Sequence, residues 1–453
     1  MIVSKFGGTS VGTFEAMQRS ARIVASNTDR RLVVISATSG TTNDLVALQD
    51  ATLDSTSKEE ILQRIEKRHL DIITKCQKQD KLLKTFRKQF SELRLHLDDS
   101  GRDKRWKDRL YAFGELMSTK IFVEVLQEHG IDAQWLDARD VIKTDSEFGN
   151  ANPILESIGK KAAKLIDKTK THLTQGFIGS DIFGSTTTMG RGGSDFTAAL
   201  LAEAVRANTL EIWTDVAGVF TTDPRIVPDA QAINEISFSE AAELSVFGGK
   251  VLHPATLKPA IREGVNVRVA SSHNPDEAGT WIVKEADHKP VIRAISLRKD
   301  QTLLTVNSLE MLHKHGFLAQ LFRVLADHRI SVDLVTTSEV SVALTLDTAV
   351  NAAHKVELNE QILDELRKFA EVTVEEDLAL VALIGNNLDS TSGVVGPLFT
   401  ALEQFNIRVV CHGASSNNLC FIINEEDAED IIRMLHDKFI TRKEMPEAKP
   451  ELS

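Results

Sequence analysis

The chain has 453 residues, of which 42% are hydrophobic and 26% charged, enough for about three domains with ordinary globular cores. Its 53 Lys and Arg residues stand against 65 Asp and Glu residues, and the net charge of −12 argues against nucleic acid or an anionic membrane as the main partner. No apolar run approaches the roughly 18 residues of a membrane span, and the start MIVSKFGGTS lacks the pattern of a signal peptide. We therefore expect a cytoplasmic protein without a membrane partner.

Strand-like runs alternate with amphipathic stretches from the N-terminus onward. Residues 2–6 form a predicted buried strand, Gly7-Gly8 breaks it, and Thr9 or Ser10 can cap a following helix. The charged stretch 54–109 has helical spacing and few breakers, which predicts a helical insertion. Further strands are predicted at 32–37, 131–141, 173–178, 211–214 and 266–270, with a hairpin at 180–188. This order is typical of an α/β fold, with a mostly parallel sheet between helices.

The C-terminal part contains an internal repeat. When the segment 303–347 is shifted by 77 residues it lies on 380–424 without a gap, so that Gly316 falls on Gly393 and Leu321 on Leu398. Each copy has the pattern strand, glycine turn, helix, strand, turn, strand and helix. We predict two small α+β domains in tandem.

The segment Lys5-Phe-Gly-Gly-Thr-Ser10 has the features of a phosphate site. Glycines let the backbone approach an anion, N–H groups at a helix start point toward it, and a lysine adds positive charge. The spacing is not that of a Walker A motif. Taken alone, the segment is equally compatible with a solvated lysine beside a turn.

Three further loops carry charged residues. In Gly190-Arg-Gly-Gly-Ser-Asp195, Arg191 offers a planar fork for a carboxylate, while Asp195 is either a helix cap or a catalytic acid. Asp215 follows a predicted strand, where open α/β sheets bind ligands, and Gly248-Gly-Lys250 supplies another cationic loop.

The cysteines (Cys76, Cys411, Cys420) and the 13 histidines show no metal-type spacing, so we expect reduced thiols and no catalytic zinc.

Together these motifs closely resemble the aspartokinases of the amino-acid kinase family. The resemblance rests on KFGGTSV at 5–11, GRGGSD at 190–195, WTDVAGVFTTDPR at 213–225 and FGGKVLHP at 247–254, and the segment 311–347 is similar to the lysine-sensitive branch. It implies an amino-acid kinase domain at 1–292 and two ferredoxin-like ACT domains at 293–377 and 378–453. It also implies transfer of the γ-phosphate of Mg-ATP to L-aspartate, giving 4-phospho-L-aspartate, with L-lysine as inhibitor.

The resemblance also assigns roles to individual residues. The catalytic residues would be Lys5 and Asp195, and the substrate would contact Thr42, Glu115, Arg191 and Ser194. ATP would contact Lys5, Gly7, Gly8, Thr214, Asp215, Phe220, Arg225, Lys250 and Val251, and Mg²⁺ would be held mainly through ATP rather than by a protein metal site. Phe220 departs from the family pattern, which usually has tyrosine there, so a hydroxyl contact to the nucleotide is lost.

A carboxylate acceptor fits this set of residues. The acceptor is already anionic and needs no general base, so catalysis reduces to positioning and to shielding the charge of two anions. The alternatives are another family member acting on a different acid, carbamate or nucleotide, and an amino-acid sensor without catalytic activity.

In the tail, the resemblance places a lysine site in the first repeat. Its residues would be Met311, Gly316, Phe317, Leu318, Val332, Asp333, Thr337, Ser338 and Glu339. The positions of Asp333 and Glu339 become Val410 and Ser416 in the second copy, so that copy should serve dimerisation instead. We expect a homodimer, with a dimer of dimers as an open alternative. A second alternative makes both copies a dimerisation scaffold.

Overall fold

The computed structural model describes residues 1–99, 101–248, 254–312, 315–346 and 358–443, without the side chains of 254–257. These residues form two compact units. The first contains Met1–Val219, Ala232–Phe238 and the described residues from Pro254 to Asp287. The second contains residues 220–231, 239–248 and the described chain from His288 onward.

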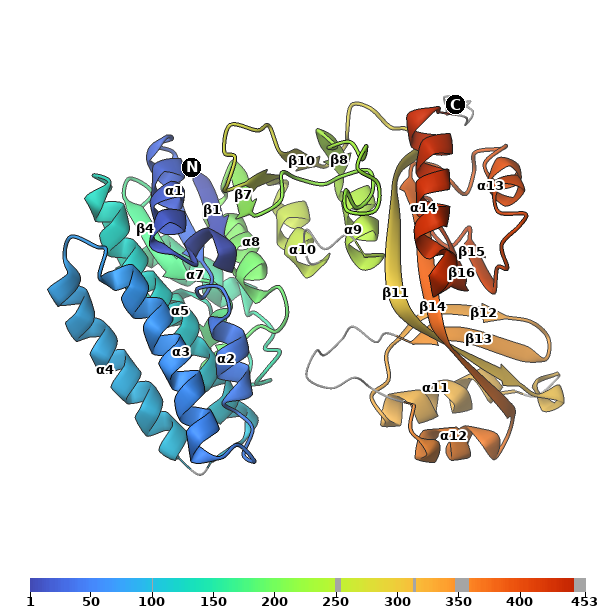
Figure 1. Ribbon diagram of the computed structural model, residues 1–453, viewed down its shortest axis with the longest axis horizontal. Coiled ribbons are helices and arrows are strands. Elements are labelled where there is room, and N and C mark those ends of the chain that lie inside the picture. The colour runs from blue at the N-terminus through green and yellow to red at the C-terminus, as the bar shows by residue number, and fades with distance from the viewer. Residues whose placement is uncertain (100, 249–253, 313–314, 347–357, 444–453) are drawn as a thin grey trace. The chain divides into compact units, whose positions relative to one another are not determined.

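The first unit is built on an eight-stranded sheet with the order β3-β4-β2-β1-β7-β9-β10-β8 (Figure 1). The strands from β3 to β9 in this order are parallel, and β10 runs antiparallel to β9. Their bounds are β1 Ile2–Phe6, β2 Arg30–Ile35, β3 Ala133–Leu136, β4 Thr171–Gln175, β7 Thr209–Thr214, β8 Glu235–Ser237, β9 Asn266–Ser271 and β10 Thr280–Val283. The predicted mostly parallel sheet is therefore confirmed, with β1 near its centre.

The predicted helical insertion is also confirmed. It consists of α3 (Ser55–Ile73), α4 (Gln79–Asp98) and α5 (Lys104–Glu128), which lie side by side in Figure 1. Their apolar faces join one core with β1 and β2. The remaining elements of this unit are α1 Phe14–Ala25, α2 Thr41–Ala47, α6 Ala138–Val141, α7 Leu155–Leu165, α8 Gly193–Val205, α10 Pro254–Glu263, and a confirmed hairpin of β5 Ile178–Ser180 with β6 Thr186–Thr188.

Two local predictions are wrong. The strand expected at 131–141 ends at Leu136, because the Asp137 side chain accepts the N–H of Arg139 and starts the short helix α6. The cap of α1 is Thr13, whose hydroxyl accepts the N–H of Ala16, and not Thr9 or Ser10. The residues after the glycine pair form a separate 3₁₀ turn at Gly8–Val11.

The second unit contains a six-stranded antiparallel sheet with the order β12-β13-β11-β14-β16-β15. Its long central strands β11 (Ile292–Asn307) and β14 (Glu371–Gly385) run antiparallel to each other (Figure 1). The other elements are α9 Phe238–Val246, α11 Phe317–Asp327, β12 Val332–Thr337, β13 Ser341–Leu346, α12 Glu360–Arg367, α13 Val395–Ala401, β15 Val409–His412, β16 Asn418–Asn424 and α14 Ala428–His436.

Backbone geometry repeats at the same spacing as the sequence. Gly316 and Gly393 have φ angles of +87° and +86°, a left-handed conformation that glycine adopts without strain. Leu321 and Leu398 are both fully buried, each in its own apolar core. The repeated order of elements is therefore confirmed. The two copies share one sheet, since the segment 292–298 of β11 pairs with the end of β14.

Candidate active site

The predicted catalytic loops begin at one edge of the parallel sheet. There the N–H of Gly7, directly after β1, donates to the carbonyl of Trp213 near the end of β7 at 3.1 Å. Likewise the N–H of Gly176, directly after β4, donates to the carbonyl of Ile35 at the end of β2 at 2.9 Å. Ligands of open α/β sheets bind beyond the carboxyl ends of the strands, which is this edge.

Lys5 and Asp195 form an ion pair at this edge. The Lys5 Nζ lies 2.5 Å from the Asp195 Oδ1, and the two side chains are only 10% and 16% exposed. Helix α8 has Gly192 as its N-cap, with φ +72° and no capping side chain. The cap interpretation of Asp195 is therefore wrong, and its carboxylate instead pairs with the Lys5 ammonium.

The two glycines after β1 differ in what they allow. A Cβ on Gly8 would lie 3.0 Å from the carbonyl oxygen of Ala37, so this glycine permits the loops after β1 and β2 to touch. A Cβ on Gly7 would meet nothing closer than 3.7 Å, and its N–H is already bonded to Trp213. Close packing thus requires glycine at position 8 and not at position 7.

Glu115 is a buried carboxylate with unused bonding capacity. Its side chain comes from α5, and its Oε1 accepts the N–H of Ala37 at 3.1 Å. Its Oε2 is buried without a hydrogen-bond partner among the described residues. Burial raises the pKa of Glu115 to about 8. A ligand ammonium would both satisfy the free oxygen and favour the charged form. Thr42 lies half-buried in the first turn of α2.

The turn that carries Arg191 is built from left-handed glycines. Gly190 and Gly192 have φ angles of +70° and +72°, and the Arg191 side chain is exposed. Ser194 is half-buried, and a Cβ on Gly176 would lie 2.5 Å from its Cβ. Gly176 therefore lets the start of α8 pack against the end of β4.

Sequence reasoning missed Gly176 and also Asp108. The Asp108 carboxylate is fully buried in α5 and accepts the N–H groups of Gly149 and Thr188 at 3.0 and 2.8 Å. It also accepts the Thr188 hydroxyl at 2.8 Å, and burial raises its pKa. It thereby fixes β6, which leads into the Arg191 turn. Its partners lie 41 and 80 residues away in the sequence, so no local pattern marks them.

The residues predicted to bind nucleotide fall in different places. Thr214 ends β7 and Asp215 follows it, at the edge that carries Lys5, and the Thr214 hydroxyl donates to the Asp215 carboxylate at 3.0 Å. Phe220 and Arg225 belong to the second unit, where the exposed Arg225 pairs with Asp223 at 2.6 Å. Lys250 and Val251 lie outside the described residues.

The predicted regulatory residues lie in the first copy of the repeat. Asp333 already has a cationic partner, because it pairs with Arg298 at 2.7 Å, whereas Glu339 is exposed. Gly316 is the N-cap of α11 and Phe317 is buried in the core. Of the others, Met311 packs on that core, Val332 is half-buried, Leu318 and Thr337 are exposed, and the Ser338 hydroxyl bonds Ser341 at 2.6 Å.

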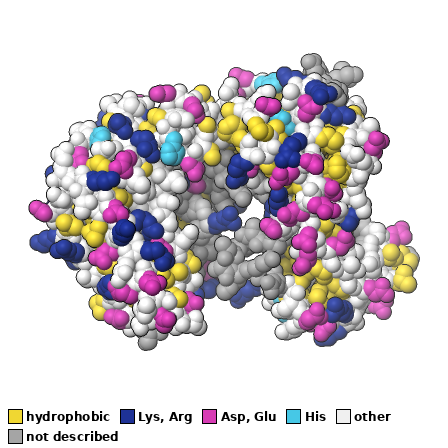
Figure 2. All heavy atoms as spheres, viewed as in Figure 1, with side chains coloured by type: hydrophobic (Ala, Val, Ile, Leu, Met, Phe, Trp, Pro, Cys, Tyr) yellow, Lys and Arg dark blue, Asp and Glu magenta, His cyan; other side chains and the backbone are white. Residues whose placement is uncertain are grey.

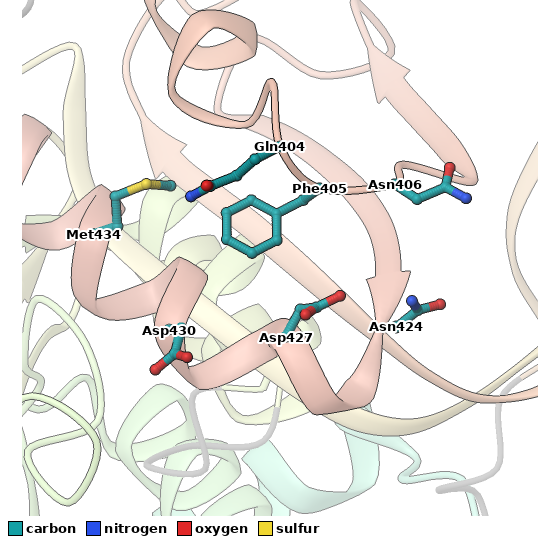
Figure 3. A pocket seen from close by; sticks show the side chains of 7 residues that line it. All are labelled: Gln404, Phe405, Asn406, Asn424, Asp427, Asp430 and Met434. Atoms are coloured by element: carbon teal, nitrogen blue, oxygen red, sulfur yellow. The ribbon is translucent and has the colours of Figure 1, made fainter.

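A separate hollow lies in the second copy of the repeat. This cavity of about 670 Å³ is lined by Gln404, Phe405, Asn406, Asn424, Asp427, Asp430 and Met434. In Figure 3 the Phe405 ring lies between the Gln404 side chain and the α14 helix. None of the predicted lysine-binding residues lines it.

Within the described parts of the chain, no three His, Cys, Asp or Glu side chains gather in a way that could hold a metal ion. The helices that the structure describes include none that is long and apolar enough to cross a membrane. On the face shown in Figure 2, basic and acidic side chains are interspersed over both units.

Comparisons with known proteins agree with this geometry. A model of the amino acid kinase family matches residues 1–271, and an ACT domain model matches residues 381–439. The lysine-sensitive aspartokinase 3 of Escherichia coli (strain K12) is 48% identical over 442 residues, which cover 96% of this chain and 98% of that protein. The chain belongs to the aspartokinases of the amino acid kinase family.

More distant aspartokinases and solved structures extend the comparison. The chloroplastic aspartokinase 2 of Arabidopsis thaliana is 36% identical over 461 residues, or 96% of this chain and 84% of that protein. E. coli aspartokinase III in complex with aspartate and ADP, in the R-state, is similar with a TM-score of 0.89 and 47% identity, over 97% of this chain and 100% of that one. Its T-state complex with lysine and aspartate gives a TM-score of 0.84 and 48% identity, over 97% and 99% of the two chains.

Proposed function

We propose that this aspartokinase transfers the γ-phosphate of ATP to the β-carboxylate of L-aspartate and is inhibited by L-lysine. The observation that carries the proposal is its 48% identity to a lysine-sensitive aspartokinase over 96% of the chain. The geometry supports it, because Lys5 near the carboxyl end of β1 pairs with Asp195 at the start of α8, and the buried Glu115 of α5 accepts the N–H of Ala37 in the loop after β2.

Each side chain meets a different charge of the reactants. The substrate carboxylate attacks as the anion it already is, so the main obstacle is repulsion from the phosphate. The Lys5 ammonium, held by Asp195, reduces that repulsion where charge develops on the transferred group. Glu115, with one free oxygen, receives the α-ammonium of aspartate, and Arg191 receives the α-carboxylate. Thr42 and Ser194 complete the substrate contacts.

The donor set also fits Mg²⁺ that arrives with ATP. Such an ion is bound mainly through phosphate oxygens and water, with only one or two carboxylates from the protein. Asp195, in the first turn of α8, and Asp215, directly after β7, are the carboxylates that could serve. The ion would neutralise charge on the phosphates. Gly7, Gly8 and Thr214 complete the nucleotide contacts that we propose within the first unit.

For regulation we propose that lysine binds the first ACT repeat and that the second serves a homodimer. Asp333 and Glu339 have no acidic counterparts in the second copy, where Val410 and Ser416 stand in the equivalent positions. The proposed domains are 1–292, 293–377 and 378–453. A cytoplasmic location is part of the proposal, supported by three free cysteines.

Hydroxylamine trapping tests the activity directly. The purified chain, given Mg-ATP and L-aspartate, should form an acyl phosphate that hydroxylamine converts to a coloured hydroxamate. Lys5→Ala serves as the matched inactive variant. No hydroxamate from a folded, nucleotide-binding chain would favour the sensor, and product from carbamate instead of aspartate would favour another kinase of the family.

A further inference from the structure

His69 is a fully buried histidine that lies outside the predicted site. It belongs to α3 and stacks on Phe86 of α4, with ring centroids 5.4 Å apart and an interplanar angle of 19°. Its Nδ1 lies 2.8 Å from the carbonyl oxygen of Ile65, and its Nε2 lies 3.3 Å from the hydroxyl of Thr38. Both ring nitrogens are therefore used.

The direction of each hydrogen bond in this group follows from chemistry. The Ile65 carbonyl can only accept, so the His69 Nδ1 carries the proton and the Nε2 is a bare acceptor. Thr38 must then donate to that Nε2. The 2.7 Å contact between the Thr38 and Thr41 hydroxyls consequently has Thr41 as its donor, and Arg68 donates to Thr41 at 3.1 Å. The result is a directed relay: Arg68 to Thr41, Thr41 to Thr38, Thr38 to His69, and His69 to the Ile65 carbonyl.

The relay holds the turn between β2 and α2. Thr38 and Thr41 are 1% and 0% exposed, and the N–H of Thr41 also donates to the Thr38 carbonyl at 3.0 Å. Directly before the relay, the N–H of Ala37 binds the Glu115 carboxylate. Directly after it stands Thr42. The turn therefore contacts Glu115 at one end and carries Thr42 at the other, and these are two of the four proposed contacts to the amino-acid substrate.

We propose that His69 is a positioning residue for the amino-acid substrate, acting through Thr38 and Thr41 on Glu115 and Thr42. This inference rests on the proposed function, since it concerns the aspartate end of the site. His69 itself touches neither substrate. Its bare Nε2 gives the buried Thr38 hydroxyl the one acceptor that keeps the turn in place.

The state of the ring supports this role. Burial lowers the pKa of His69 to about 4, so the imidazole is neutral at physiological pH and its Nε2 remains an acceptor. A protonated ring would present an N–H to Thr38 and reverse the link between Thr38 and His69.

The test uses hydroxyl and ring variants with a matched control. Thr38→Val removes the hydroxyl donor while keeping the shape of the side chain, whereas Thr38→Ser keeps the hydroxyl. His69→Leu removes the Nε2 acceptor. We expect the aspartate KM to rise about three- to tenfold in Thr38→Val and His69→Leu, the range of one lost hydrogen bond. The ATP KM should stay within about twofold. The double variant should be no worse than the stronger single one, because both remove the same link.

The control is His96→Leu. His96 is also a buried histidine of the helical insertion, 5% exposed, stacked on Trp106 at 4.8 Å with its Nε2 2.9 Å from the Trp106 carbonyl. The His96→Leu variant should lose stability, as His69→Leu does, but its aspartate KM should stay unchanged. A rise of the aspartate KM in His96→Leu, or equal behaviour of Thr38→Val and Thr38→Ser, overturns the proposal. The Thr38 pair decides the question if His69→Leu does not fold.

A second readout separates this inference from the proposed function. In protein labelled with ¹⁵N-histidine, the His69 signals, assigned by their loss in His69→Leu, should report the tautomer with the proton on Nδ1. A proton on Nε2 overturns the relay whether or not the chain phosphorylates aspartate. If the Nδ1–H tautomer is present but the chain does not phosphorylate aspartate, the proposed function is wrong. The relay then only holds the turn, and His69 does not position a substrate.

Discussion

The Lys5 ammonium and the Asp195 carboxylate lie 2.5 Å apart, each in a side chain that is at least four-fifths buried. Lys5 is the penultimate residue of strand β1 and Asp195 belongs to the first turn of α8, so the pair ties a strand to the helix that follows the Arg191 turn. A buried cation needs such a partner, and the pairing also fixes the direction in which the ammonium points.

Replacing Lys5 should remove phosphoryl transfer while leaving the fold. Loss of one preorganised charge contact costs on the order of 10²–10³ in turnover, so kcat of Lys5→Ala should fall by about that factor. The measurement is the hydroxamate assay at saturating ATP and aspartate. Asp195 then loses its partner, so circular dichroism and thermal unfolding must accompany the assay. Retention of more than about a tenth of normal turnover would remove Lys5 from the mechanism.

Arg191→Ala should raise the aspartate KM strongly and the ATP KM little, because the guanidinium addresses the α-carboxylate of the substrate. Arg105→Ala, an exposed arginine near the start of α5, is the control for a lost surface charge. If Arg191→Ala raised the KM of aspartate and the KM of ATP equally, the Arg191 side chain would instead contact the nucleotide phosphates.

Glu115 predicts a dependence on pH whose sign can be worked out. Its pKa in the folded chain is about 8, above the ordinary value of 4.5, so between these pH values the folded chain holds a proton that the unfolded chain has released. The contribution of Glu115 to stability is therefore full below pH 4.5 and decreases as pH rises toward 8. Glu115→Gln should remove this decrease, which melting curves over that range would reveal.

The same carboxylate should affect substrate binding with the opposite trend. Neutral Glu115 attracts the α-ammonium of aspartate poorly, so the aspartate KM should fall as pH rises toward 8. Glu115→Gln should raise that KM and flatten the profile. An unchanged KM profile in the variant would separate Glu115 from the substrate.

Gly176 offers a test of the packing that positions α8. In Gly176→Ala the new Cβ would lie 2.5 Å from the Ser194 Cβ, so backbone must shift, at a typical cost of about 1–3 kcal/mol in the free energy of unfolding. Activity should fall with it. Gly159→Ala is the control: nothing lies within 4 Å of its Cβ inside α7, and alanine should stabilise that helix by about 0.5–1 kcal/mol. Equal effects of the two variants would contradict the packing argument.

The contrast between Lys5 and Gly176 shows what the sequence can and cannot predict. Lys5 stands in a local pattern of strand, glycine pair and hydroxyl residues, and such patterns predicted the parallel sheet and the edge that carries the site. Gly176, Asp108 and His69 act through partners distant in the sequence, so no local pattern marks them. The repeat was visible because turns and core positions recur at a fixed spacing. The shared sheet was not, since the pairing of the segment 292–298 with β14 leaves no periodic signal.

Lysine feedback should act through the first repeat alone. An effector must bind two global states with different affinity, and the coupling is typically about 1–3 kcal/mol. Glu339 is exposed and available to an ε-ammonium, whereas Asp333 is already paired with Arg298. Glu339→Ala should therefore relieve inhibition with uninhibited turnover near normal. Asp333→Ala should relieve it too and also lower stability, because it leaves the Arg298 guanidinium without this partner.

Ser416→Ala, at the equivalent position of the second repeat, is the matched control and should keep wild-type inhibition. Calorimetry on the wild-type chain should give one lysine per chain. Two sites per chain, or full inhibition in both Glu339→Ala and Asp333→Ala, would contradict the assignment to one repeat. Inhibition by threonine would also count against it, because the neutral threonine side chain has no ε-ammonium for these two carboxylates to receive.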